Sequence, residues 1–278
     1  MDNTKFWESR IGKNFSDKGG WRSGEHGLTA HGGGLVHSYG YSLLDDLAGK
    51  ISYFQLLGLY VKGSIIDRSL ADWIESYFFG LSYPEDRIWC NLAVCLAGDM
   101  KASVEAAVSA GILAYESRAY GPGASTIIVT FITDAFKKRK RGWTVKKIID
   151  ECPVENNVPV VPGFNRPILT GDERIPMLEN RRIELGIKKG PHLTLLYEIQ
   201  DILAPYHEYI NAGGYRSAFL TDNGFDTPEL HEMLMVTVGV AGFIACYSDK
   251  INKEQGSFYP LKCEDVDYVG VEPFSLTL

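Results

Sequence analysis

Apolar residues recur at helical spacing along most of the chain. Side chains three and four residues apart lie on one face of an α-helix, so such a repeat predicts a helix with one buried face. The repeats begin at Leu43 and continue through residues 54–60, 67–81, 88–116, 125–138, 173–186, 191–210 and 227–249. Extended segments are expected only at 35–39, at 156–164 and near the C-terminus. The pattern therefore predicts an all-α fold.

Asp67 and Thr227 directly precede two of the repeats and are expected to cap their helices. The repeat at 88–116 differs from the others because it is rich in small residues: Ala93, Ala97, Gly98, Ala102, Ala106, Ala107, Ala110 and Gly111. Small side chains let helices approach closely. We therefore expect a central, buried pair of helices in this part of the chain.

The composition is that of an acidic globular protein. The chain has 278 residues, enough for a large core, and a formal net charge of -7. Nucleic-acid binding requires a basic face, and this charge balance argues against one. The longest apolar stretch, Met233 to Cys246, is too short to cross a bilayer, and the N-terminus has no apolar signal-peptide segment. We expect a cytoplasmic protein that binds neither nucleic acid nor membrane.

The cysteines and histidines do not form a metal-binding pattern. The chain has five cysteines without a CxxC pair, and none of its six histidines forms an HExxH motif. Cys90, Cys95 and Cys246 fall in apolar helical repeats, which predicts buried, reduced thiols. We expect no metal site and no permanently bound cofactor.

Two further segments leave alternatives open. Gly32 to Gly34 are a weak candidate for a phosphate-binding loop, but no lysine-bearing helix start follows them, so a flexible turn is favoured. The basic run Lys137 to Arg141 is typical of a solvated face, and a contact with a phosphate anion is the alternative.

Several segments, in order, resemble motifs of the citrate synthase and citryl-CoA lyase family. Residues 37–47 are similar to the family's RGYxLxDL signature, and residues 162–164 lie where it has GxGH. Asn211 and Gly224 keep the spacing of NVD to a following glycine, and residues 238–245 are similar to GRxxGWxAH. The resemblance covers nearly the whole chain.

This resemblance implies an architecture. It places residues 1–121 and 223–278 in a large helical domain and residues 122–222 in a smaller, mobile helical domain, with the active site in the cleft between them. It also implies a two-fold homodimer, in which the small-residue segment 93–110 packs against its mate.

The resemblance also implies a chemistry. The family joins an acyl-CoA to a keto acid, or reverses that reaction. A base removes a proton beside the thioester, and hydrogen-bond donors stabilise the resulting enolate. The family supplies an aspartate base, one histidine for the enol, another for the keto oxygen, and arginines that bind carboxylates through bidentate contacts.

The matching positions of this chain hold other side chains. Tyr120 stands at the position of the enol-stabilising histidine, Arg166 at that of the keto-polarising histidine, and Arg87 at that of a further histidine. Gly213 replaces the aspartate base, and Gly239 replaces a substrate-binding arginine. The ordinary citrate synthase reaction is therefore not expected.

The replacing residues indicate a site for an anion. A tyrosine hydroxyl can stabilise an oxyanion, whereas an arginine can bind a carboxylate but cannot shuttle a proton. The candidate catalytic residues are Tyr120, Arg166, Asp86 and Arg87; Glu116 is the alternative to Asp86 as a base, and both carboxylates are also typical of solvated helix ends. The candidate substrate-binding residues are Arg174, Asn165, Arg216 and Asn211, with a surface position or an ion-pair role as the alternative for Arg216. The candidate CoA-binding residues are Val161, Pro162, Gly163 and Phe164.

Arg166, Arg174 and Tyr120 are expected to face one cleft. Two guanidinium groups near each other repel unless an anion or an acidic side chain lies between them. One hypothesis is therefore an enzyme that makes or breaks a C–C bond on an acyl-CoA or a related anionic acid with non-standard catalytic residues. The alternative, motivated by Gly213, is a non-catalytic relative that binds a metabolite or a partner, or that serves as the dimer partner of an active paralogue.

Overall fold

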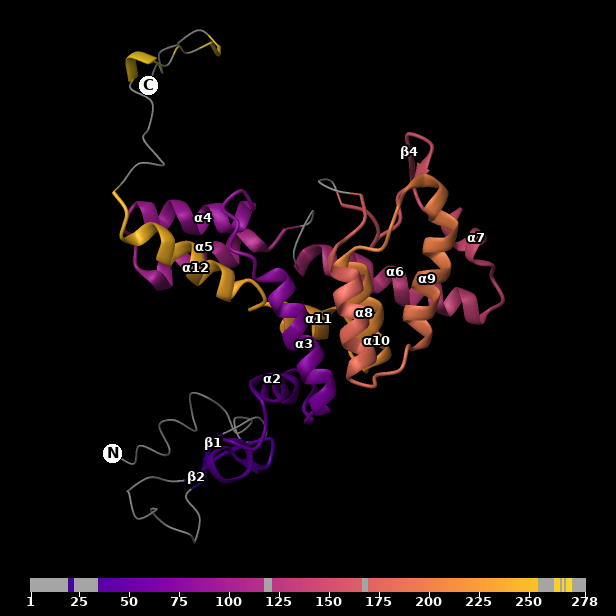
Figure 1. The fold of residues 1–278 in the computed structure, drawn as a ribbon, viewed down its shortest axis with the longest axis horizontal. Helices are drawn as coiled ribbons and strands as arrows, with labels where there is room; N and C mark the ends of the chain where they lie inside the picture. The colour runs from indigo at the N-terminus through magenta and orange to yellow at the C-terminus, as the bar shows by residue number, and fades with distance from the viewer. Residues whose placement is uncertain are drawn as a thin grey trace, which may run out of the picture. The chain divides into compact units, whose positions relative to one another are not determined.

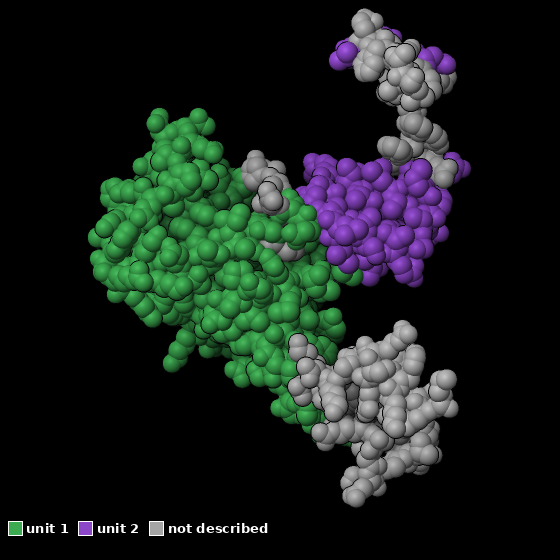
Figure 2. Space-filling view, turned by 180° about the vertical axis from the view of Figure 1, so that it is seen from behind, with its two compact units in different colours: residues 1–83, 115–240 green, residues 84–114, 241–278 purple. Residues whose placement is uncertain are grey.

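The computed structural model describes residues 20–22, 35–117, 122–166, 170–254, 263–265, 267 and 269–271. Helices dominate, with two small antiparallel sheets (Figure 1), and the predicted all-α class is confirmed. The chain forms two compact units, residues 1–83 with 115–240 and residues 84–114 with 241–278 (Figure 2). The expected division into residues 1–121 with 223–278 and residues 122–222 follows other boundaries and stays a prediction.

The first unit contains most of the regular elements. Its N-terminal part consists of β1 (Gly20–Arg22), β2 (Leu35–Ser38), β3 (Tyr41–Ser42) and a π-helical turn, η2 (Leu43–Leu47). The rest of the unit consists of α2 (Tyr53–Lys62), α3 (Arg68–Leu81), α6 (Pro122–Lys140), α7 (Val145–Ile149), β4 (Val154–Glu155), β5 (Val158–Pro159), α8 (Arg174–Glu184), α9 (Pro191–Leu203), the 3-10 turn η3 (Ala204–Tyr206), α10 (Ala212–Asp222) and α11 (Pro228–Met235).

Local chemistry explains several of these boundaries. The predicted extended segment at 35–39 forms β2, which pairs antiparallel with β1 and β3. Thr227 caps α11 as expected, because its side chain accepts a hydrogen bond from the N–H of Leu230. Asp67 occupies the N-cap position of α3, but its side chain makes no capping bond.

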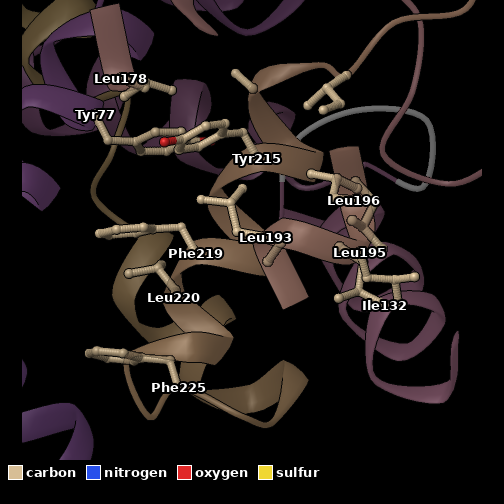
Figure 3. Packing of buried hydrophobic residues seen from close by; sticks show 14 of the residues in the cluster. Tyr77, Ile132, Leu178, Leu193, Leu195, Leu196, Tyr215, Phe219, Leu220 and Phe225 are labelled. Carbon is tan, nitrogen blue, oxygen red and sulfur yellow. The ribbon is translucent and has the colours of Figure 1, made fainter. Parts of the chain in front are cut away.

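The core of the first unit surrounds α10, which contacts α6, α8 and α9. Trp73 of α3 is fully buried, and its ring lies 3.9 Å from that of Phe219 and 6.1 Å from that of Tyr215, measured between centroids. Figure 3 shows Tyr215, Phe219 and Leu220 of α10 among side chains of the neighbouring helices. The indole N–H of Trp73 donates to the carbonyl of Leu178 at 3.1 Å, which ties α3 to α8.

The periodicity did not predict α10. Residues 214–221 are all buried, so this helix has no polar face and no helical alternation of apolar and polar residues. It begins with Asn211 as its cap and continues through two glycines, which are poor helix formers. The helix at the centre of the unit is thus the one with the weakest signal in the sequence.

The second unit contains α4 (Trp89–Asp99), α5 (Val104–Tyr115), α12 (Val240–Ile251) and the 3-10 turn η4 (Cys263–Asp265). The pair of helices expected over 88–116 is present as α4 and α5, which are separated by a turn that contains Lys101 with φ +62°. The expected close approach of helices is present. A Cβ atom on Gly111 would lie 2.5 Å from Cγ2 of Val94, so α4 and α5 pack in direct contact.

Two predicted helices are divided. The helix expected at 191–210 ends at Leu203, and the one expected at 227–249 is interrupted by a turn at 236–239. By length and composition, the helical stretch Pro228–Ile251 could span a membrane, so the expectation that no stretch is long enough is wrong by this criterion. Of its most apolar part, 44% is buried inside the protein, and a core helix of a soluble protein meets the same criterion.

Candidate functional site

Asp172 is the centre of a charged cluster at the start of α8. Its side chain is fully buried and accepts hydrogen bonds from Nε of Arg174 at 2.8 Å and from Nη2 at 2.7 Å. Nη1 of Arg166 lies 3.2 Å from the same carboxylate, and the N–H of Ala212 donates to it at 2.8 Å. An acidic side chain therefore lies between the two arginines and offsets their mutual repulsion. The alternative, a bound anion between them, is not needed for this.

The pKa values agree with this arrangement. Burial raises the pKa of Asp172, but the hydrogen bonds and the charge of Arg174, together with the N–H of Ala212, outweigh burial and hold it below its usual value. Burial lowers the pKa of Arg174, and the partnership with Asp172 outweighs it, so the pKa of Arg174 is raised. Asp172 and Arg174 are therefore both charged at neutral pH.

Arg166 is held on both sides. Its Nη1 also lies 2.6 Å from Oε2 of Glu173, and its side chain is only 16% exposed. The carboxylate side chain of Glu173, by contrast, is 63% exposed. An incoming anion that binds Arg166 through Nη1 would therefore compete with Glu173, whereas the buried carboxylate of Asp172 would stay in place.

The backbone around Gly163 fixes this arginine against α10. Gly163 has φ +90° and Asn165 has φ +59°, so the turn at 161–166 bends sharply. Asn211 binds this turn through three bonds: its N–H donates to the Gly163 carbonyl at 3.0 Å, and its Nδ2 donates to the carbonyls of Phe164 at 3.2 Å and Asn165 at 2.9 Å. Its Oδ1 accepts from the N–H of Gly214 at 2.9 Å and caps α10. Asn211 and Asn165 thus act here as structural residues.

Gly213, at the position of the family's base, lies in the first turn of α10. A Cβ atom there would meet Oδ1 of Asn211 and Cδ1 of Ile128, each at 3.2 Å. This space is tight, but the Ile128 contact is the end of a flexible side chain. The position offers no acid or base.

A cavity of about 350 Å³ lies beside the turn. Of the four candidate CoA-binding residues, Val161 and Phe164 line it; Pro162 and Gly163 belong to the same turn. Asn165 also lines it and donates from Nδ2 to the carboxylate of Glu208 at 3.0 Å. Burial raises the pKa of Glu208. With Glu155 a second carboxylate on its wall, the cavity favours uncharged or amine-bearing groups over phosphates.

Arg216 lies in the interior of the first unit. Its guanidinium carbon is 5.8 Å from the ring centroid of Tyr77, and its Nη2 donates to Oγ of Ser217 at 3.1 Å. Burial, followed by the charge of Arg216, lowers the pKa of His231 to about 3. Arg216 is buried, so it does not have the surface position given as an alternative. Its described contacts include no ion pair.

Asp86 and Arg87 belong to the second compact unit. Nη2 of Arg87 lies 2.6 Å from Oε2 of Glu85, and the Arg87 side chain is 86% exposed. Oδ2 of Asp86 lies 3.6 Å from Nζ of Lys250. Tyr120 lies outside the described residues. The structure therefore brings together Arg166, Arg174, Asn165 and Asn211, and the sequence did not point to Asp172, which joins the two arginines.

The basic run at the end of α6 is partly neutralised. Lys138 lies 2.7 Å from Asp134 and 2.6 Å from Glu151, and Arg139 lies 3.4 Å from Glu198. Nζ of Lys140 lies over the ring of Phe136. These contacts favour the interpretation of a solvated face. Among the described residues, no group of three or more His, Cys, Asp or Glu side chains could hold a metal ion.

Comparison with known proteins identifies the fold. No family model matches the sequence, and no curated protein sequence matches it. The structure is similar to citryl-CoA lyase from Hydrogenobacter thermophilus, with a TM-score of 0.73 and 24% identity over 92% of this chain and 98% of that one. It is similar to ATP citrate lyase from Methanothrix soehngenii, with a TM-score of 0.73 and 15% identity over 98% of this chain and 45% of that one.

A citrate synthase from Thermoplasma acidophilum is also similar, with a TM-score of 0.62 and 16% identity over 81% of this chain and 59% of that one. At these identities the likeness concerns the fold, and it agrees with the order of motifs along the sequence. The chain therefore has the fold of citryl-CoA lyases and citrate synthases.

Proposed function

We propose that this protein binds a small anionic acid, or its CoA thioester, at the cluster around Asp172 and makes or breaks a C–C bond in it. The observation that carries the proposal is the pair Arg166 and Arg174, held by one buried carboxylate. The fold supports it, because the similar ATP citrate lyase structure contains citrate and coenzyme A.

The geometry suits carboxylate binding better than proton transfer. Both guanidinium groups keep part of their surface exposed, and both are oriented by Asp172 before a ligand arrives. Pre-oriented arginines bind a carboxylate with less loss of side-chain entropy than free ones. Since Glu173 already contacts Arg166, ligand binding would exchange one carboxylate for another at this guanidinium.

The CoA part of such a ligand would use the cavity beside the turn. Backbone groups and the side chains of Val161 and Phe164 form one wall of that cavity, and Glu155 and Glu208 provide hydrogen-bond acceptors. An adenine amine suits these acceptors, whereas the phosphates require cations elsewhere. Tyr120, Asp86 and Arg87 remain our candidates for the catalytic acid, base and anion contacts.

We also propose that the chain forms a homodimer. The second unit exposes large apolar side chains on each of its main helices, including Leu92 of α4, Leu113 of α5 and Ile244 of α12, with Leu113 77% exposed. A soluble protein rarely leaves such side chains uncovered together, and a second copy would cover them. Light scattering at micromolar concentration should give twice the chain mass. The expected large and small domains and the cytoplasmic location remain predictions.

A second function is favoured by Gly213. With no side chain at the position of the base, the protein would bind its anion without turning it over. Loss of a general base typically costs ~10²–10⁴-fold in rate, so we expect no measurable citrate formation from acetyl-CoA and oxaloacetate. Turnover near that of ordinary citrate synthases would contradict the binding-only function and show that Gly213 does not stand at the position of the base.

Thermal-shift measurements with CoA, acyl-CoAs, and di- and tricarboxylates test the proposal. Arg166→Ala should reduce the ligand-induced shift strongly, while the ligand-free melting temperature changes little. Arg181→Ala is a control for the loss of an arginine, because Arg181 lies on α8 and pairs only with exposed Glu184 among its charged neighbours. If Arg166→Ala unfolds the free protein and leaves the ligand response intact, Arg166 is a structural ion-pair residue. Detection of thioester cleavage or formation with a stabilising ligand would separate the enzyme from the binding protein.

A further inference from the structure

The helices α4 and α12 of the second unit pack closely at their C-terminal ends. A Cβ atom on Gly98 would lie 3.2 Å from Cβ of Lys250 and 3.5 Å from the ring of Tyr247. Nζ of Lys101 donates to the Ile251 carbonyl at 2.8 Å, which fixes the end of α4 to the end of α12. The absence of a side chain at Gly98 thus allows the two helix backbones to lie near each other.

Cys95 and Cys246 lie one helical turn before this contact. Cys95 precedes Gly98 by three residues, and Cys246 precedes Lys250 by four, so the packing of the two helices places the cysteines near each other. Both side chains line a cavity of about 380 Å³, together with Asp86, Asp249 and Lys250. A small solute entering this cavity meets both sulfur atoms.

We propose that Cys95 and Cys246 form an intramolecular disulfide bond when the protein meets a low-molecular-weight disulfide. The two helices approach closely at Gly98 and both cysteines line one cavity, so rotation of the two side chains with small shifts of the helices can bring the sulfur atoms to the bonding distance of about 2.05 Å. This inference is independent of the proposed function, because it concerns residues that make no contact with the Asp172 cluster among their described partners.

The chemistry balances as a thiol–disulfide exchange. The Cys95 thiolate attacks one sulfur of the oxidant, the S–S bond of the oxidant breaks, and one thiol leaves. The Cys246 thiolate then attacks the mixed disulfide at Cys95, the second thiol leaves, and the Cys95–Cys246 bond forms. The oxidant gains two electrons and two protons, and the two cysteines lose the same number.

The surroundings favour Cys95 as the first nucleophile. Burial raises the pKa of both thiols, and that of Cys246 is about 12. At Cys95 the neighbouring thiol of Cys246 and the charge of Lys250 oppose this rise, while the charges of Asp86 and Asp249 add to it. At Cys246 the neighbouring thiols and the charge of Asp86 all add to the rise. Because only the thiolate reacts, exchange should accelerate roughly tenfold per pH unit below the thiol pKa values.

Two other described cysteines serve as controls. Cys90 is buried near Asn91 and does not line the cavity. Cys152 belongs to the first compact unit, where its sulfur lies 3.9 Å from the Ile148 carbonyl. Burial raises the pKa of Cys152 as well, so a difference in reactivity would reflect the pairing of thiols rather than pKa alone.

The test is exposure of the reduced full chain to glutathione disulfide, followed by alkylation of free thiols and peptide mapping without reduction. We expect a peptide pair linked through Cys95 and Cys246, formed roughly tenfold faster at about pH 8 than at about pH 7. We also expect a higher melting temperature that dithiothreitol reverses, because the bond closes a long loop of the unfolded chain. Cys246→Ser should abolish the linked pair, and Cys152→Ser should leave it unchanged.

Peptide mapping of the wild-type chain tests the Cys95–Cys246 bond even if a variant fails to fold. Alkylation of both cysteines without any link, a glutathione adduct at Cys95 that persists, or a link between two chains would each overturn the proposal. A linked pair that survives Cys246→Ser would overturn it too, because another cysteine would then be the partner.

Discussion

The contact between Gly163 and Gly214 allows a sharp test of how the site is held together. A Cβ atom on Gly214 would lie 2.2 Å from the carbonyl oxygen of Gly163 and 2.9 Å from its Cα. Both atoms belong to backbone, so no side-chain rotation can relieve the clash. Gly214→Ala must therefore move the turn at 161–166 away from α10 by about 1 Å, since a normal contact requires at least about 3 Å.

The cost of this movement can be worked out from the contacts it disturbs. Overpacking of this kind costs roughly 1–3 kcal/mol. The N–H and Nδ2 of Asn211 bind the same turn, and weakening one or two of these bonds costs about 1 kcal/mol each. The higher helix propensity of alanine returns about 1 kcal/mol. The free energy of unfolding should fall by about 1–4 kcal/mol, a drop in melting temperature of roughly 3–12 °C.

Gly213→Ala is the matched control, one residue away in the same helical turn. Its Cβ atom would meet Oδ1 of Asn211 and Cδ1 of Ile128 at 3.2 Å, contacts that small adjustments can relieve. Its stability should stay within about 1 kcal/mol of the wild type, because strain and helix propensity offset each other. Urea unfolding followed by circular dichroism measures both variants. Equal stability of the two variants would refute the reasoning.

Three further predictions concern charged groups. Asp172→Asn should lower the free energy of unfolding by about 3 kcal/mol at neutral pH, measured by urea unfolding, because it leaves two arginines without their buried counter-charge. Since the folded pKa of Asp172 is lowered, the wild type keeps this contribution above pH 3.8 and loses it as pH falls further. Glu173→Gln should tighten carboxylate binding roughly two- to fivefold in calorimetry, because the competing carboxylate of an exposed pair is removed; unchanged affinity would place the ligand elsewhere. His231 has a folded pKa of about 3 against 6.5 when unfolded, so its contribution to stability falls as pH drops below 6.5, by about 2 kcal/mol at pH 5; His231→Gln should flatten this dependence in urea titrations.

The sequence predicted the helices that have two different faces. The repeats at 67–81, 125–138 and 173–186 correspond to α3, α6 and α8, each with a polar side toward solvent. The position of the break between α4 and α5 was not predicted, because small apolar residues continue on both sides of it and a positive φ at lysine has no composition signal. The helix α10 was not predicted because it is buried on all sides, so its sequence has no alternation of apolar and polar faces.

The proximity of Arg166 and Arg174 was predicted, but the residue between them was not. Arg166 and Arg174 were expected to lie together, and the requirement for a negative charge between them was stated without a residue to meet it. Asp172 meets it, two positions before Arg174 in the sequence. A carboxylate so close to an arginine is usually a solvated neighbour, and only the bond from Ala212 of α10 makes it a buried one. That contact joins segments 40 residues apart, which local patterns do not reveal.

The structure separates two properties that a citrate synthase site combines. In the proposed function, anion binding would depend on Asp172, Arg166 and Arg174, and these groups are held by backbone contacts that the small residues Gly163 and Gly214 permit. Proton abstraction in the resembled family uses a side chain at the position of Gly213, where this chain has little spare room. The proposed anion site therefore needs no further group, whereas proton abstraction would have to come from a group outside this turn, such as Tyr120 or Asp86, or be absent. Binding measurements and turnover measurements thus test different parts of the molecule, and a positive result in the first carries no implication for the second.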